Sequence, residues 1–330
     1  MGRRFVDLFV HGRGRGHGSR SRVLYDLLLN DGYEVRVFAG PGALGAFSDI
    51  AVVQEIASLL PSSGLEAPRL IVERLSHAAA QHQIQPASCV VSDGDLPGIL
   101  HARRHNLPSI AVGHGLVFSH ARPPEGVSRV LWEREGLKSR LSSIGSTYQL
   151  AVNFVELTPR SRNCQVVRPR FDDAITRLPA QDSREVVCYF RDDNGDSIVR
   201  ALVDMGFSPV VFAHRKTAIS GVAYREPGRE AFREALARAY AVVSSAGSQL
   251  ISECLAAGIQ HYVFYKRDDP EQRLNAEMLR AAGKGEGQSF EHWSRDALER
   301  YLFQDTSSQS GDSWGEDVGE ALLKRVDDSI

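Results

Sequence analysis

Short apolar runs and helical segments alternate along this chain, first near its N-terminus and again in its second half. In the first stretch, strands are expected at residues 5–10, 33–40, 88–94 and 109–115, and helical spacing of apolar residues follows the first of them. Repeated β-α alternation predicts a parallel sheet with helices on both faces. Ligands of such sheets bind at the carboxyl ends of the strands, so the loops after the strands are where a site is expected.

A connector with two prolines and several charges, at about residues 165–185, separates the two stretches. Beyond it the expected strands are residues 185–190, 208–213, 239–245 and 260–265, and the expected helices are residues 197–205, 229–239, 248–257 and 271–282. A chain of 330 residues is longer than one hydrophobic core usually serves. We therefore predict two domains, residues 1–168 and 169–314. A C-terminal helix within residues 315–330 is expected to pack back onto the first.

Composition excludes several classes of function. The formal net charge of -2 gives no bulk attraction to nucleic acid or to an anionic membrane, and no apolar run reaches the length of a membrane span. Asp7 interrupts the first apolar run, which reads as a strand and not as a signal peptide. The four cysteines are scattered without metal-site or disulfide spacing. We expect a cytoplasmic protein; peripheral membrane contact is not indicated.

A glycine-rich loop, HGRGRGHGSRSRVL at residues 11–24, joins the first strand to the first helix. The dinucleotide fingerprint GxGxxG does not fit it, because His17 and Ser19 stand where the third glycine is needed, and a P-loop lysine is missing. The loop could be a turn whose glycines serve only the backbone. Because it opens a helix, a ligand near the exposed backbone N–H groups is the favoured interpretation.

The stretch AYAVVSSAGSQLISECLAAGIQHYVFYKRDDPEQRLNAEMLRAAG, residues 239–283, resembles the nucleotide-sugar site of GT-B glycosyltransferases, among them the peptidoglycan UDP-N-acetylglucosamine transferase and UDP-glycosyltransferase families. The resemblance implies an α/β protein with two Rossmann-like, doubly wound parallel-sheet domains facing a central cleft. It also implies that Gly247 and Ser248 contact the diphosphate, Glu253 the ribose, and Glu271 and Gln272 the sugar. The expected donor-binding residues are Gly16, Arg191, Gly247, Ser248, Gln249, Glu253, Glu271, Gln272 and Asn275.

The first half of the chain supports the same resemblance through two short motifs. GRGHGSR is similar to the glycine-rich loop that carries the catalytic base of many inverting members, which implies that role for His17. VVSDGDLPG places Asp93 where those members have the aspartate that orients the base. His11 and His114 compete for the role of base, and His11, His114 and Phe118 are the expected acceptor-binding residues.

The implied reaction transfers a sugar from a UDP-sugar, or another nucleoside-diphosphate sugar, to a hydroxyl of an acceptor. A neutral histidine can take the hydroxyl proton, and a carboxylate stabilises the imidazolium that forms. A helix N-terminus and an arginine can stabilise the leaving diphosphate, so we expect no cofactor and no metal. Candidate arginines are Arg168, Arg170, Arg191 and Arg215. The sequence does not identify the acceptor, the sugar or the nucleobase.

Three alternatives remain open at this point. A UDP-sugar hydrolase of the same architecture would use water in place of the acceptor. Asp93, Gly94 and Asp95 form a DxD motif, which binds a divalent metal in single-domain GT-A transferases. The arginines at positions 13, 15, 20 and 22 could form a loop that binds nucleic acid.

Overall fold

The computed structural model describes residues 4–12, 15–50, 53–56, 67–84, 86–171, 184–191, 195–214, 218–304 and 314–330. The chain divides into two compact units. Unit 1 comprises Met1–Arg122, Glu133–Asp172 and Trp314–Ile330, and unit 2 comprises Pro123–Trp132 and Asp173–Ser313. The chain therefore leaves unit 1 twice and returns to it for its last residues.

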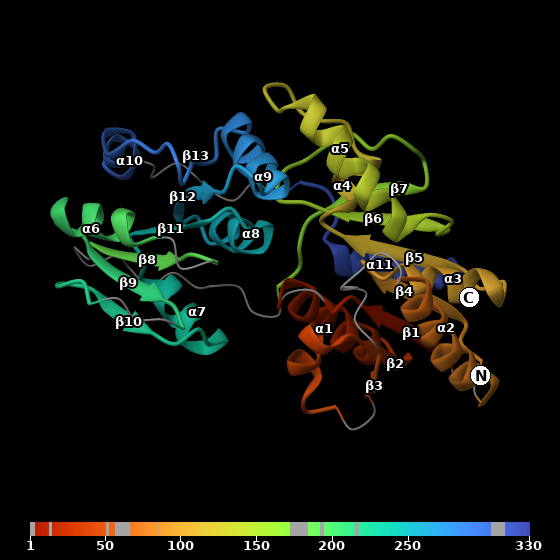
Figure 1. Ribbon diagram of the computed structural model, residues 1–330. Coiled ribbons are helices and arrows are strands. Elements are labelled where there is room, and N and C mark those ends of the chain that lie inside the picture. Colours follow the sequence, from red (N-terminus) through yellow and green to blue (C-terminus); the bar gives the residue numbers. More distant parts are fainter. Residues whose placement is uncertain are drawn as a thin grey trace. The chain divides into compact units, whose positions relative to one another are not determined.

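Unit 1 contains a seven-stranded parallel sheet with the strand order β3-β2-β1-β4-β5-β6-β7 (Figure 1). The strands are β1 (Phe5–Val10), β2 (Glu34–Ala39), β3 (Val53–Glu55), β4 (Cys89–Asp93), β5 (Ser109–Gly113), β6 (Tyr148–Val152) and β7 (Cys164–Val167). The helices are α1 (Arg15–Asn30), α2 (Ala67–Ile84), α3 (Leu96–Arg104), α4 (Leu116–His120), α5 (Arg129–Arg140) and α11 (Val318–Asp327), with short 3-10 helices η1 (Pro41–Phe47) and η2 (Leu141–Ser143). α5 begins in the segment that belongs to unit 2.

Alternation along β1 gives the sheet of unit 1 two buried faces. Val6, Leu8 and Val10 join the larger core, which also contains residues of α1 and α11. Phe9 lies in the core of the opposite face, which includes residues of α2 and α3. Because both faces are covered, the strands are apolar along most of their length, as parallel strands usually are.

The C-terminal helix α11 packs on the sheet of unit 1, where Figure 1 draws it in blue. Asp317 caps it: its carboxylate accepts hydrogen bonds from the backbone N–H groups of Gly319 and Glu320. Arg170 donates to the same carboxylate at 3.0 Å, which ties α11 to the segment after β7. An amphipathic helix gains most of its stability from such packing, so the last residues of the chain complete the first core.

Unit 2 contains a six-stranded parallel sheet with the strand order β10-β9-β8-β11-β12-β13. The strands are β8 (Glu185–Tyr189), β9 (Ser208–Phe212), β10 (Ala223–Arg225), β11 (Ala241–Ser245), β12 (Gln260–Tyr265) and β13 (Glu286–Ser289). The helices are α6 (Asp196–Asp204), α7 (Arg229–Arg238), α8 (Ser248–Ala256), α9 (Pro270–Ala281) and α10 (Arg295–Leu302). Two apolar clusters fill the two faces of this sheet.

The two all-parallel α/β units confirm the predicted fold class. In each sheet the chain starts near the middle, winds to one edge and then returns to wind to the other. The switch lies between β1 and β4 in unit 1 and between β8 and β11 in unit 2. Open α/β sheets bind ligands at such switch points. Among the described residues, no helix is both long enough and apolar enough to cross a membrane.

Candidate functional site

In unit 1, the loops after β1 and β4 lie side by side at the switch point. The backbone N–H of His11 donates to the carbonyl of Asp93 at 3.0 Å, which joins the ends of the two strands. α1 begins two residues before His17, so this histidine lies in the first turn of a helix. The local fold therefore brings His17 to Asp93, which ends β4.

His17 and Asp93 form a direct hydrogen bond. His17 Nδ1 lies 2.7 Å from Asp93 Oδ1. The His17 side chain is 29% exposed and that of Asp93 is fully buried, so the imidazole is the member of the pair that a ligand can reach. A carboxylate only accepts hydrogen bonds, so this contact assigns the proton of neutral His17 to Nδ1 and leaves the lone pair on Nε2.

Arg20 and Ser21, one helical turn after His17, hold the carboxylate of Asp93. Arg20 Nε donates to Asp93 Oδ2 at 3.0 Å, and Ser21 Oγ donates to the same oxygen at 2.8 Å. Burial alone would raise the pKa of Asp93, but the charges of Arg20 and His17 hold it well below its ordinary value. Arg20 Nη2 also lies 3.3 Å from His17 Nδ1, but the shorter contact to Asp93 decides the tautomer. Asp93 is therefore an anion with a fixed orientation.

The glycines near this site have different roles. Gly94 has φ +70°, and a Cβ there would lie 2.9 Å from His17 Cε1, so no side chain is compatible with the present position of the ring. A Cβ on Gly12 would lie 2.9 Å from Gly40 Cα, and Gly18 faces Ala46 across the contact of α1 with η1. Gly16 meets no atom and is exposed. Of the described loop glycines, Gly12 and Gly18 therefore serve packing, and Gly16 leaves open space.

The two carboxylates of the DxD motif turn to different partners. Asp93 binds His17, whereas buried Asp95 caps α3: its Oδ2 accepts from the Gly98 N–H at 3.2 Å. Ser92 Oγ also donates to the Asp95 carbonyl. A metal-binding DxD needs oxygens that converge on one ion, and this arrangement does not provide them.

The three residues expected to bind acceptor lie in different environments. His11 is half-buried, and its ring meets that of His17 edge-on, with 5.4 Å between centroids. His114 is buried; its Nδ1 lies 3.0 Å from the Val152 carbonyl, and its ring packs against Phe118 and Phe154. Phe118 is 1% exposed. Of the three, only His11 accompanies His17, and His114 and Phe118 pack inside unit 1.

In unit 2, the loops after β8 and β11 meet at the second switch point. The backbone N–H of Arg191 donates to Ser245 Oγ at 3.0 Å. Gly247 precedes α8, is exposed and meets no atom within 4 Å of an added Cβ. No side chain caps the N-terminus of α8, which begins at Ser248. A helix N-terminus of this kind favours an anionic group such as phosphate.

A second helix N-terminus, that of α9, contributes polar groups at the same edge of the sheet. Asp269 caps α9 by accepting from the Gln272 N–H at 3.1 Å, and it also accepts from Gln272 Nε2 at 2.9 Å. Arg191 Nη1 lies 3.6 Å from Asp269 Oδ2 in an exposed ion pair. Glu271 is exposed next to them. Arg191, Glu271 and Gln272 are thus placed together by β8 and α9.

The remaining expected donor residues lie on or under α8. Glu253 Oε1 accepts from Gln249 Nε2 at 2.9 Å, one turn earlier in the helix. Burial raises the pKa of Glu253, and the hydrogen bond from Gln249 opposes that shift. Asn275 is fully buried, and its Nδ2 donates to the carbonyl of Ala246 at 3.0 Å. Asn275 therefore supports the β11–α8 loop from below.

Two of the other arginines considered from the sequence have partners within unit 1. Arg168 donates to the Gly315 carbonyl and Arg170 to Asp317, both in unit 1, and Arg215 lies outside the described residues. Among the candidates that the structure describes, Arg191 is the one that lies in unit 2, where it contacts Ser245 and Asp269. In the glycine-rich loop, Arg13 and the side chain of Arg15 lie outside the described part of the chain.

The remaining two basic side chains of that loop are already paired. Arg20 binds Asp93, and Arg22 binds Asp26 and Asp49. Two of the four charges that a nucleic-acid loop would need are thus neutralised within the fold.

Sequence reasoning missed several residues that build these sites. Arg20 and Ser21 follow His17 by three and four residues, which is the spacing of neighbours on one helix face, so a helix beginning at Arg15 would have revealed them. Asp269 stands three residues before Gln272 and directly before a proline, which is a typical helix N-cap pattern. Ser245 carries no comparable signal.

The family model of glycosyl transferase family 1 matches residues 66–304. A search of curated proteins found no significant match to this sequence.

Solved structures with the same fold cover nearly the whole chain. MurG of Acinetobacter baumannii has a TM-score of 0.72 and 14% identity over 98% of this chain and 99% of its own. The calicheamicin glycosyltransferase CalG4 has a TM-score of 0.67 and 17% identity over 100% and 95%. A UDP-GlcNAc 2-epimerase from Neisseria meningitidis, bound to UDP-GlcNAc, has a TM-score of 0.65 and 15% identity over 97% and 100%. These likenesses establish the GT-B fold.

The family model extends over more than half of the sequence and into both structural units. The resemblance that the motifs indicated is thereby confirmed, and the chain belongs to glycosyl transferase family 1 as a GT-B nucleotide-sugar glycosyltransferase.

Proposed function

We propose that this protein is an inverting glycosyltransferase that moves a sugar from a UDP-sugar to an acceptor hydroxyl, with His17 as general base. The observation that carries the proposal is the 2.7 Å hydrogen bond between His17 Nδ1 and the buried carboxylate of Asp93. A partly exposed imidazole that is held by a fixed anion is suited to accept a proton from a hydroxyl.

The proposed chemistry follows from the assigned tautomer. His17 Nε2 accepts the proton of the acceptor hydroxyl as the oxygen attacks the anomeric carbon, and the bond to the diphosphate breaks in the same displacement. A single displacement inverts the anomeric configuration. The imidazolium that forms is stabilised by Asp93, whose ionised form Arg20 and Ser21 favour.

Unit 2 is proposed to bind the donor. The diphosphate would lie at the N-terminus of α8, near Gly247, Ser248 and Gln249. Arg191 is exposed and holds Asp269 only at 3.6 Å, so it can turn to a phosphate. Glu253 would bind the ribose hydroxyls.

The sugar and the acceptor complete the proposed assignment. Glu271 and Gln272 are proposed to bind sugar hydroxyls, with Asn275 fixing the loop that precedes α8. The acceptor is proposed to bind in unit 1 beside His11 and His17. Asp95 is committed to the cap of α3, which supports a transfer step that needs no metal at the DxD motif.

A nucleotide-sugar hydrolase is the second candidate, because a fixed His-Asp pair activates water as readily as a hydroxyl. Product analysis separates the two: a hydrolase releases free sugar when no acceptor is present. If free sugar were released without an acceptor as fast as the donor is consumed in the presence of each acceptor tested, the protein would be assigned as a hydrolase instead of a transferase.

The test begins with a thermal-shift screen of nucleoside diphosphates and nucleotide sugars, since a ligand of the folded state raises the melting temperature. With the donor so identified, His17→Ala is expected to lower kcat by at least about 10²-fold. Asp93→Asn is also expected to lower kcat, and the affinity for UDP should stay close to that of the wild type in both variants.

The matched control is His77→Ala, which removes an exposed imidazole from α2. Wild-type single-turnover rates in His17→Ala would reject His17 as the base.

A further inference from the structure

A carboxylate lies buried in the middle of β1, away from the strand end that leads to His17. Asp7 is fully buried between apolar neighbours on the strand. Its partner in the sheet register is Arg36 of β2, whose Nε donates to Asp7 Oδ1 at 2.7 Å. Asp7 Oδ2 is buried and has no hydrogen-bond partner among the described residues. Burying such an oxygen without a hydrogen bond is costly, so the position calls for a partner.

Three histidines gather beside this oxygen, from the last turns of α2 and α3 and the residue that follows α3. The ring centroids of His82 and His105 lie 4.2 Å apart, and those of His101 and His105 lie 4.7 Å apart. His101 is fully buried, and neither of its ring nitrogens has a hydrogen-bond partner in the described part of the chain. Its Nε2 lies 3.7 Å from Asp7 Oδ2, too far for a hydrogen bond.

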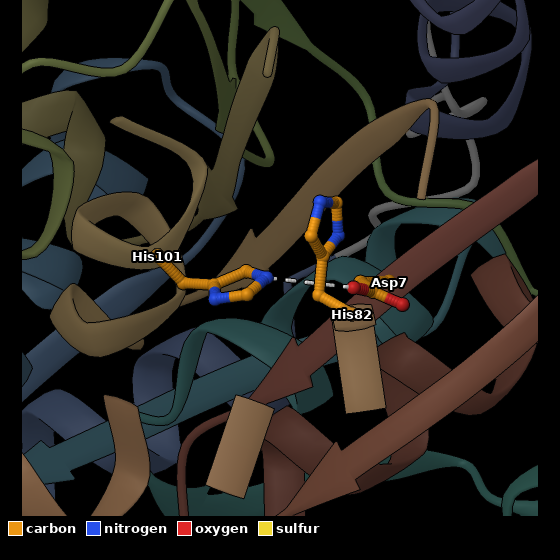
Figure 2. Close-up of side chains that lie close together, drawn as sticks. All are labelled: Asp7, His82 and His101. Atoms are coloured by element: carbon orange, nitrogen blue, oxygen red, sulfur yellow. Dashed lines mark ion pairs between the residues drawn. The ribbon is translucent and has the colours of Figure 1, made fainter. Parts of the chain in front are cut away.

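Figure 2 shows how the side chains of Asp7, His82 and His101 converge. The Asp7 carboxylate and the His101 imidazole face one another, and the ring of His82 stands beside the line that joins them. One ligand atom from each of the three residues lies within 4.8 Å of the other two. Ligand atoms on a tetrahedral zinc ion are about 3.3 Å apart. Small side-chain rotations would therefore bring the three atoms onto one ion.

The chemical state of the side chains also suits a metal. His101 is fully buried, and burial favours the neutral imidazole, which is the form that ligates a metal. The guanidinium of Arg36 beside Asp7 favours the ionised carboxylate, which is the form that binds a metal. Arg36 occupies only Oδ1 and orients the carboxylate, as groups behind a metal ligand commonly do.

We propose that Asp7, His82 and His101 bind one Zn²⁺ ion, which links β1, α2 and α3 inside unit 1. Imidazole nitrogen and carboxylate oxygen are ligands typical of zinc. The ring of His105 packs against those of His82 and His101, and its buried Nε2 has no hydrogen-bond partner among the described residues. Because Asp7 and His101 are fully buried, the ion would have a structural role. It would reach the site past His82, which is half-buried.

This site is separate from the proposed transfer chemistry. Asp7 lies on β1 itself, whereas His17 follows the end of that strand in α1. Metal removal should therefore lower stability and leave the transfer step intact. The two proposals can fail independently, because kcat tests one and metal stoichiometry tests the other.

The experiment uses tag-free, full-length protein that has been treated with a chelator and dialysed. Bound zinc is measured by elemental analysis after re-addition of Zn²⁺, and affinity by competition with a chromophoric chelator. One zinc per chain and a higher melting temperature are expected. Cobalt in place of zinc should give the intense visible absorption of a tetrahedral site. Binding of no zinc by the wild-type chain would overturn the proposal.

The variants identify the ligands. His82→Ala, in the half-buried position, and Asp7→Asn should each weaken zinc at least about tenfold, which corresponds to about 1.4 kcal/mol. His77→Ala, an exposed histidine of the same helix, should bind zinc as the wild type does. If Asp7→Asn does not fold, the cobalt spectrum of His82→Ala decides. Unchanged zinc affinity and cobalt spectrum in His82→Ala would overturn the site.

Discussion

At the scale of single residues, the position of the His17 ring depends on two neighbouring residues, Asp93 and Gly94. Asp93 holds Nδ1 at 2.7 Å, and a Cβ on Gly94 would lie 2.9 Å from Cε1, the ring carbon bonded to Nδ1. The glycine is required twice, because its φ of +70° disfavours a side chain and because the space of a Cβ is taken by the imidazole. A base that must meet a hydroxyl at hydrogen-bond distance tolerates little displacement.

Gly94→Ala is expected to displace the imidazole and lower kcat about tenfold or more, since a misplacement of 1 Å can cost about 10²-fold. The same change should destabilise the fold by roughly 1–3 kcal/mol through backbone strain. Steady-state kinetics and chemical denaturation measure the two effects.

Gly283→Ala is the matched control for Gly94→Ala. Gly283 also has positive φ, at +64°, but an added Cβ meets no atom. Both variants should lose stability, and only Gly94→Ala should lose turnover. Equal kcat in the two would show that the close approach of Gly94 to His17 has no part in catalysis.

At the scale of elements, the start of α8 is where the second unit presents its open backbone. Gly247 leaves space, and Asn275 holds the preceding loop by its bond to the Ala246 carbonyl. Glu253 lies one turn beyond Gln249, whose Nε2 donates to it. A ribose hydroxyl pair could take over from Gln249, because a carboxylate accepts several hydrogen bonds at once.

Glu253→Ala is expected to weaken UDP binding by roughly 1.5–3 kcal/mol, since a hydrogen bond to a charged acceptor is lost. Isothermal titration with UDP measures the loss. A deoxyribose analogue of UDP is a further control. The loss of binding free energy caused by Glu253→Ala should be smaller for this analogue, because it lacks the hydroxyl that Glu253 would bind in the wild-type protein. An equal penalty for both ligands would contradict the ribose role, and Glu234→Ala, exposed on α7, should have no effect.

The alternation of strands and helices predicts most interior strands of both sheets, but it misses the interior strand β6 and the edge strands β3, β7, β10 and β13. The buried strands β1, β4, β8, β11 and β12 are apolar runs in the sequence. The strands β3, β10 and β13 have three or four residues each, lie at the edges of their sheets, and carry polar residues such as those of EGQS. An edge strand is covered less and needs fewer apolar side chains, so its signal is weak.

The candidate sites were also predicted only in part from the sequence. The candidate site residues His17, Asp93, Gly247 and Glu253 could be picked out from the sequence because each lies in a short motif that resembles those of a known family. The partners that hold them, such as Arg20 for Asp93, depend on which elements meet in space. Phe118 shows why an apolar residue after a strand is hard to interpret from sequence. Such a residue can belong to a binding surface or to the core, and Phe118 lies in the core.

At the scale of the whole molecule, each sheet has its own core, and the chain order does not follow the order of the units. The last residues return to unit 1, where Val318, Leu322 and Val326 are buried with residues of β1 and α1. The capping box of Asp317 and Glu320 fixes the start of this helix, and Tyr33 donates to Asp327 near its end. Unit 1 therefore depends on residues far from it in sequence.

Leu322→Ala is expected to destabilise unit 1 by about 2–5 kcal/mol, because it removes a fully buried side chain and leaves a cavity. The described core residues of unit 2 include none from α11. The variant should therefore bind UDP with wild-type affinity at a temperature where unit 1 is still folded. Ile330→Ala, 43% exposed, is the matched control and should change neither quantity. Thermal unfolding with and without UDP separates the contributions: the nucleotide should raise only the transition of unit 2, and Leu322→Ala should lower only that of unit 1. One transition that responds to both would mean that the two cores unfold as a single cooperative unit.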